Sequence, residues 1–114
     1  MSDCIFCKIA RHEIPARVLF ENDDLFAFHD INPQAPVHIV IIPKVHVENV
    51  LSASDEHTGI LGKLLRAAAG AATQTGIAET GFRVVLNNGV DGGQSVDHLH
   101  VHVLGGRKLA WPPG

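Results

Sequence analysis

The chain has 114 residues, of which 46% are hydrophobic, and a formal net charge of −3. This length and composition suit one ordinary core, so we expect a single domain over residues 1–114. The scattered Lys and Arg residues argue against a nucleic-acid polymer as partner, and the most apolar run, residues 37–43, is too short to span a bilayer, so we expect a cytoplasmic protein that does not bind membranes.

The first half of the chain predicts one short helix and three strands. Residues 4–11 carry apolar side chains at helical spacing, and Pro15 disfavours continuing the helix. Residues 18–20 and 25–27 alternate apolar and polar around an acidic turn, which predicts a hairpin. The β-branched run at residues 37–42 predicts a strand buried on both faces until Pro43 ends it.

The second half predicts the main helix and two more strands. Ser54 is a helix-capping residue, apolar side chains recur from residue 60 to residue 68 at helical spacing, and Gly76 ends the segment. Residues 81–88 and 97–104 have strand patterns and flank a glycine-rich loop. We therefore expect an α+β fold with about five antiparallel strands, one long helix and one short helix.

Three of the eight histidines alternate with apolar residues at His98, His100 and His102. Alternate side chains of a strand point to the same face, so the three imidazoles are expected to share one face. Three interpretations are open: a polar strand face that happens to use histidine, a metal site, or nucleophilic catalysis.

The glycine-rich loop immediately before this row favours catalysis. Residues 92–95 read Gly-Gly-Gln-Ser, and glycines let the backbone turn so that successive N–H groups point at an anion. A glycine pair taken alone is more often only a turn. Its place directly before the histidines is what suggests a nucleophile beside a bound phosphate.

Cys4 and Cys7 are the only cysteines, and their spacing suits a metal site or a redox pair better than a structural disulfide in a reducing compartment. Two thiolates supply half of a tetrahedral zinc site, and the chain has histidines to complete it. The alternative is a pair of reduced thiols packed as small apolar groups.

The motif at residues 94–103, QSVDHLHVHV, resembles the signature of the histidine-triad (HIT) family, in which three histidines alternate with apolar residues. The resemblance extends over nearly the whole chain, through residues 4–9, 28–31, 36–38 and 104–114. The closing residues, Trp-Pro-Pro-Gly, resemble the Hint branch of nucleoside phosphoramidases more than the dinucleotide hydrolase branch.

By this resemblance, His100 is the nucleophile that attacks the α-phosphorus and forms a nucleotidyl-histidine intermediate, which water then hydrolyses. The nucleophile must be a neutral imidazole, so its other ring nitrogen should donate to a backbone carbonyl. The remaining roles that the family pattern implies are charge stabilisation by His102 and His38, leaving-group binding by Ser95, and phosphate binding by Asn87, Gly93 and Gln94. Without the resemblance, His38 reads equally well as a buried structural histidine.

The resemblance also implies the nucleotide contacts. Asp30 would accept hydrogen bonds from both ribose hydroxyls. A purine base, as in AMP or GMP, would lie in an apolar slot formed by Ile5, Phe6, Ile9, Phe28, Ile31 and Val40. Taken alone, each of these residues would be interpreted as part of an ordinary hydrophobic core. Trp111 would reach the partner's site in a homodimer, against the alternative of a frayed tail.

In zinc-containing relatives, the ligands correspond to Cys4, Cys7, His46 and His98. Such a site would be structural, since four protein ligands leave no open position. The expected activity is hydrolysis of nucleoside 5′-monophosphate phosphoramidates. The alternatives are hydrolysis of dinucleoside polyphosphates or nucleotidyl sulfates, and nucleotide binding with incidental hydrolysis.

Overall fold

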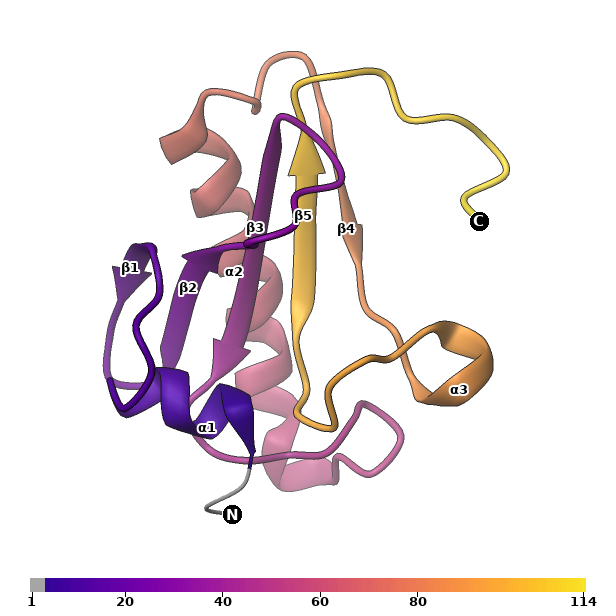
Figure 1. The fold of residues 1–114 in the computed structure, drawn as a ribbon. Helices are drawn as coiled ribbons and strands as arrows, with labels where there is room; N and C mark the ends of the chain where they lie inside the picture. Colours follow the sequence, from indigo (N-terminus) through magenta and orange to yellow (C-terminus); the bar gives the residue numbers. More distant parts are fainter. Residues whose placement is uncertain (1–3) are drawn as a thin grey trace.

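A computed structural model describes residues 4–114. Its helices are α1 (Ile5–Ala10), α2 (Thr58–Thr75) and α3 (Gly89–Gly92), and a 3₁₀ turn, η1, spans Asp55–His57. Its strands are β1 (Val18–Glu21), β2 (Leu25–His29), β3 (Val37–Pro43), β4 (Phe82–Val85) and β5 (Val101–Gly105). Figure 1 shows one sheet with α2 behind it and α1 in front. The molecule is thus a three-layer α+β fold.

The five strands form one antiparallel sheet in the order β1-β2-β3-β5-β4. β5, the last strand in the chain, lies between β3 and β4, and the long connection from β3 to β4 runs through α2. This order brings the strand that carries His38 next to the strand that carries His102.

The core behind the sheet is formed by α2. The buried residues of α2 are Leu64, Ala68, Ala71 and Ala72, which recur at helical spacing and form one stripe. They pack with Leu99, Val101 and Val103, the apolar members of the alternating row. The alternation therefore places the apolar side chains against α2 and leaves the histidines for the other face.

A smaller core lies in front of the sheet, under α1. Ile9 and Ala10 of this helix pack on Phe26, Phe28 and Val40, together with partly buried Phe6. A helix of this length is not stable alone in water, so its position depends on these contacts and on the residues that hold its ends.

The structure confirms the expected fold class and differs from the sequence predictions in detail. β5 starts at Val101 instead of residue 97, so His98 and His100 lie in the segment that leads into it, with His98 in a bend. The glycine-rich loop contains a single helical turn, α3, and Gly93 ends that turn in the left-handed region with φ 81°. None of the helices over residues 4–114 is both long enough and apolar enough to cross a bilayer.

Candidate active site and metal centre

The sheet register gathers the polar side chains on the α1 face. Val40 of β3 lies opposite His102 of β5, and His38 lies opposite Leu104. His38 and His102 are therefore diagonal neighbours on one face, close enough for large side chains to meet. Their ring centroids are 5.0 Å apart. Asp30 continues β2 on the same face, because its N–H donates to the His38 carbonyl at 2.9 Å.

His100 has one ring nitrogen engaged and one free. Its Nδ1 lies 2.6 Å from the carbonyl oxygen of His98, and a carbonyl only accepts, so Nδ1 carries the proton. Nε2 therefore keeps its lone pair. The ring is 2% exposed and packs edge-on against Phe6, with centroids 5.1 Å apart. This is the backbone contact and the tautomer that an imidazole nucleophile requires.

A chain of hydrogen bonds fixes the protonation of His38 and His102 in the same way. The backbone N–H of Gln34 donates to Nδ1 of His38 at 3.0 Å, so the proton of His38 lies on Nε2. That Nε2 donates to Nδ1 of His102 at 2.8 Å. The proton of His102 therefore lies on its own Nε2, where it is available as a donor. We call this chain from Gln34 through His38 to His102 the imidazole relay.

The imidazole relay argues against a metal ion at Asp30, His38 and His102, although their ligand atoms lie within 4.8 Å of one another. To bind a metal through Nε2, His38 would have to move its proton to Nδ1. That nitrogen faces the N–H of Gln34, so two donors would oppose each other. The three side chains are better suited to hydrogen bonding with a ligand.

Burial keeps all of these imidazoles neutral near pH 7. Desolvation, together with the smaller effects of the neighbouring imidazoles of His100 and His38, lowers the pKa of His102 to about 4. Desolvation also lowers the pKa of His100 below its ordinary value, against the opposing effect of the His98 carbonyl. For His38, desolvation lowers the pKa while the Asp30 carboxylate raises it. A neutral His100 is the form that can attack phosphorus.

Two adjoining pockets open at these residues. The first, of about 280 Å³, is mainly apolar and is lined by His100 and by the expected slot residues Ile5, Phe6, Ile9, Phe28, Ile31 and Val40. The second, of about 430 Å³, is polar and includes His38, Asn87 and Gly93. Asp30, Ser95 and His102 line both. The site thus has an apolar compartment and a polar compartment that meet at these three residues.

Two of the expected site residues lie outside both pockets. The side chain of Gln94 accepts from the N–H of Gly89 and donates to the carbonyls of Glu48 and Val96, and its own N–H donates to the Gly89 carbonyl. Its polar groups hold the loop in shape. Trp111 is 82% exposed in the C-terminal segment, which runs out beyond β4 (yellow in Figure 1).

Sequence reasoning missed two backbone groups that organise the site. The N–H of Gln34 starts the imidazole relay, and the carbonyl of Pro43 accepts a hydrogen bond from Nε2 of His98 at 2.8 Å. Nearly every residue has the same backbone N–H and carbonyl groups, so the sequence does not indicate which of them bond to a site residue. Only the folded structure shows these contacts. Pro43 could have been suspected because a strand-ending proline still keeps its acceptor oxygen.

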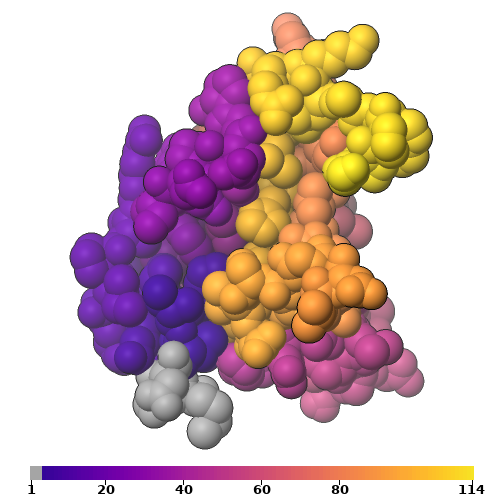
Figure 2. All heavy atoms as spheres, turned by 45° about the vertical axis from the view of Figure 1, so that its right-hand side comes forward, coloured from indigo at the N-terminus to yellow at the C-terminus, as the bar shows by residue number. Residues whose placement is uncertain are grey.

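The predicted metal ligands come together next to this site. Cys4, Cys7, His46 and His98 each offer one ligand atom, and these atoms lie within 4.8 Å of one another. Cys4 and Cys7 lie at the start of α1, and His46 follows β3. We call these four residues the Cys/His cluster. Figure 2 shows the N-terminal segment (indigo) beside the loop that precedes β5 (orange).

The donor atoms of the Cys/His cluster fit a tetrahedral ion. Nδ1 of His98 lies 3.3 Å from Sγ of Cys4, 3.5 Å from Sγ of Cys7 and 3.1 Å from Nδ1 of His46. Zinc bonds of about 2.0 Å to nitrogen and about 2.3 Å to sulfur place tetrahedral donors roughly 3.3–3.8 Å apart. The Pro43 carbonyl keeps the proton of His98 on Nε2, so its Nδ1 lone pair faces the sulfurs.

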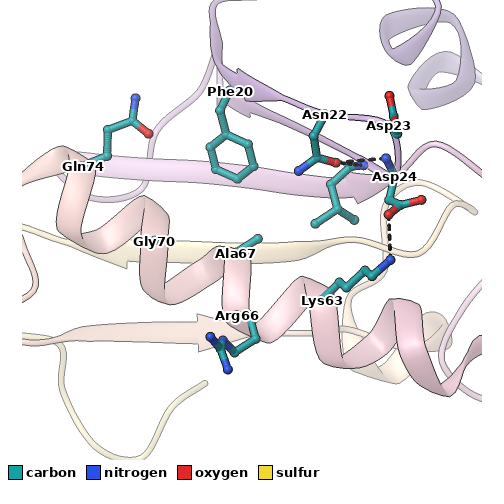
Figure 3. Close-up of a pocket in the computed structure, with 10 residues that line it drawn as sticks. Phe20, Asn22, Asp23, Asp24, Lys63, Arg66, Ala67, Gly70 and Gln74 are labelled. Atoms are coloured by element: carbon teal, nitrogen blue, oxygen red, sulfur yellow. Dashed lines mark hydrogen bonds and ion pairs between the residues drawn. The ribbon is translucent and has the colours of Figure 1, made fainter.

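A larger hollow of about 610 Å³ lies on the other face of the sheet, between the β1–β2 turn and α2 (Figure 3). Lys63 and Asp24 form an ion pair across it at 2.7 Å, and Asn22 caps the turn by accepting from the backbone N–H of Asp24 and Leu25. Among residues 4–114, the lining of this hollow includes no histidine or cysteine. His100 and the Cys/His cluster lie on the opposite face of the sheet.

Comparison with known proteins agrees with the fold and with the family resemblance. Residues 11–109 match the HIT domain model. The chain is 52% identical to the adenylylsulfatase HINT1 of Arabidopsis thaliana, over 99% of this chain and 78% of the relative. It is 51% identical to a 14 kDa zinc-binding protein of Brassica juncea, over 98% of this chain and 100% of the relative. A HIT family hydrolase from Legionella pneumophila superimposes with a TM-score of 0.96 at 47% identity, over 98% of this chain and all of the other. The chain therefore belongs to the HIT family, in which the Arabidopsis thaliana relative is named an adenylylsulfatase and the Legionella pneumophila protein a hydrolase.

Proposed function

We propose that this protein hydrolyses nucleoside 5′-monophosphate phosphoramidates, with His100 as the nucleophile. The observation that carries the proposal is the hydrogen bond from Nδ1 of His100 to the His98 carbonyl, which leaves Nε2 as a lone pair on a ring that lines the pocket. A neutral, fixed imidazole beside an apolar slot suits attack on a bound nucleotide.

The two compartments divide the substrate between them. The apolar slot receives the purine base of AMP or GMP, and the carboxylate of Asp30 accepts from the ribose hydroxyls where the two pockets meet. The phosphate lies where the two compartments meet, between His100 on the apolar side and Asn87 and Gly93 on the polar side. Gln94 contributes by holding the loop and not by direct contact.

The reaction then proceeds in two displacements. Nε2 of His100 attacks the α-phosphorus, the bond from phosphorus to the leaving amine breaks, and a nucleotidyl-histidine forms. The Nε2–H of His102, fixed by the imidazole relay, donates to a phosphate oxygen as negative charge grows there. Ser95 binds the leaving amine, which takes up a proton from solvent as it departs. Water next attacks phosphorus and loses a proton to solvent, and the bond to Nε2 breaks, which releases the nucleoside monophosphate and the neutral imidazole of His100.

The Cys/His cluster is proposed to hold zinc, as the name of the Brassica juncea relative suggests. With four protein ligands, zinc here supplies structural cross-linking and not a reactive water. The proposed assembly is a homodimer, in which Trp111 of one protomer reaches the site of the other.

A second candidate activity is cleavage of adenylyl sulfate, because a relative with 52% identity is named an adenylylsulfatase. The attack on phosphorus is the same and only the leaving group changes. Dinucleoside polyphosphates are a third class of substrate for the same nucleophile. A binding module with incidental hydrolysis is the non-enzymatic alternative.

Steady-state kinetics on the purified chain test the proposal. Adenosine 5′-phosphoramidate, adenylyl sulfate and a diadenosine polyphosphate are compared by kcat/KM, and we expect the phosphoramidate to be the best substrate. His100→Ala should abolish turnover and retain binding of AMP, as measured by calorimetry. Turnover that survives in His100→Ala would refute the mechanism. A higher kcat/KM for adenylyl sulfate would assign the second activity.

A further inference from the structure

His98 belongs to the Cys/His cluster and to the active site at once. Its Nδ1 faces the two sulfurs and His46, and its carbonyl oxygen holds Nδ1 of His100 at 2.6 Å. One residue therefore links the metal donors to the group that sets the tautomer of the proposed nucleophile.

The carbonyl of His98 lies outside the strand ladder. β5 begins at Val101, so no strand pairing holds the peptide that follows His98. Its fixed points are the side chain of His98, which is fully buried and donates to Pro43, and the N–H of Leu99, which donates to the Val47 carbonyl at 2.6 Å. The first of these depends on the imidazole of His98 keeping its place in the Cys/His cluster.

Phe6 makes a second connection between the Cys/His cluster and His100. It lies in α1 between the two cysteines, and its ring packs edge-on against His98 and His100, with centroids 6.0 Å and 5.1 Å away. Because α1 has only six residues, ligation of Cys4 and Cys7 is a main constraint on where Phe6 sits. Without that constraint, Phe6 can move and the packing contact that it makes with the His100 ring is lost.

We propose that His98 is a positioning residue through which the occupied Cys/His cluster holds His100 in its Nδ1–H tautomer. The groups that bind ribose and phosphate are anchored differently, because His38 and His102 lie in the β3–β5 ladder and Asp30 is bonded to it. Release of the metal is therefore expected to lower kcat much more than it weakens binding of ribose 5-phosphate, the part of AMP that these groups hold. This inference rests on the proposed role of His100.

The test compares two substitutions of His46, the exposed ligand whose replacement leaves no cavity in the core. His46→Asn removes a metal ligand, whereas His46→Cys retains one and serves as the rescue. His12→Asn is the control, since His12 is an exposed histidine at the other end of α1 with φ 63°, a conformation that Asn tolerates. Metal content is measured by atomic emission, and the histidine tautomers by ¹⁵N NMR.

We expect His46→Asn to lose the metal, to show His100 as a mixture of tautomers, and to lower kcat at least tenfold with a change in affinity for ribose 5-phosphate of less than about fivefold. His46→Cys and His12→Asn should keep the wild-type ¹⁵N pattern and kcat. A folded, metal-free His46→Asn with His100 still in the pure Nδ1–H tautomer and an unchanged kcat would overturn the inference.

A measurement on the wild-type chain covers the case in which His46→Asn does not fold. Replacing the native metal by cadmium, a larger ion, should move the His98 side chain while the protein stays folded, and the ¹⁵N shift of Nε2 in His100 should change with kcat. Identical His100 signals and kcat in the two metal forms would refute the coupling. If the metal-loaded wild type turns over no nucleotide substrate, the proposed function fails, whereas the tautomer signals still report on the coupling.

Discussion

The imidazole relay predicts opposite outcomes for two conservative substitutions of His38. Asn places an amide near the position of Nδ1, so it can still accept from the Gln34 N–H, but it is too short to donate to His102. Gln reaches the position of Nε2, so it can still donate to Nδ1 of His102 and loses the acceptor for Gln34. The pair therefore separates the two hydrogen bonds of one buried side chain.

The magnitude follows from the burial of the relay. The hydrogen bond from His38 to His102 is partly buried, and leaving its acceptor, Nδ1 of His102, unsatisfied costs about 1–3 kcal/mol. Since 1.4 kcal/mol corresponds to a factor of ten, His38→Asn should lower kcat/KM about 5- to 140-fold. The kcat/KM of His38→Gln should stay within about fivefold of wild type. The group that loses its acceptor in this variant is the backbone N–H of Gln34, and because Gln34 is exposed, water can accept from it instead.

The assay is kcat/KM on adenosine 5′-phosphoramidate, with the circular dichroism spectrum and the thermal midpoint of each variant as controls for folding. ¹⁵N NMR of His102 gives a direct readout, because His38→Asn should release its Nδ1 while His38→Gln should not. Equal losses of kcat/KM in the two variants, or a larger loss in His38→Gln, would refute the direction of the relay.

Three further predictions concern stability, pH and substrate. Gly105→Ala should lower the free energy of unfolding by about 1–3 kcal/mol, because a Cβ there would lie 2.6 Å from Cδ1 of Ile77. Ile77→Val removes that atom, so adding it to Gly105→Ala should recover part of the loss. Urea denaturation of the four proteins of this double-mutant cycle measures the recovery. The thermal midpoint should fall as pH drops from about 6.5 to about 4, because burial holds the pKa of His102 at about 4 in the folded protein. Over this range the unfolded chain binds a proton at His102 that the folded chain does not, so protonation favours unfolding. A thermal midpoint that does not change over this range would contradict the burial of His102. Asp30→Ala should lower kcat/KM for ribonucleotide substrates at least tenfold and for 2′,3′-dideoxy analogues far less, and equal losses would remove the ribose role.

The sequence was sufficient for the fold class and for the grouping of side chains by face. The alternation at residues 98–103 predicted that the histidines and the apolar residues lie on opposite faces, because the side-chain period of an extended chain is two. The spacing of Cys4 and Cys7 likewise predicted that they act together, because three residues make about one helical turn.

What the sequence could not provide are the contacts that depend on strand order and on backbone groups. Pairing of β3 with β5 brings His38 to His102 across 64 positions of the chain, and no local pattern contains that information. The same holds for the carbonyls of His98 and Pro43. Gln94 shows the converse problem, since its place in the family motif suggested a ligand contact, whereas its amide is used to hold the loop.

The central claim is that Nε2 of His100 forms a bond to phosphorus during turnover. Rapid quenching of a single turnover at alkaline pH, followed by peptide mass spectrometry, tests it most directly, because a phosphorus–nitrogen bond to histidine survives those conditions. The mechanism predicts a nucleoside monophosphate attached to His100 within the first turnover. Label on any other side chain, or a completed first turnover with no label on the protein, would contradict it.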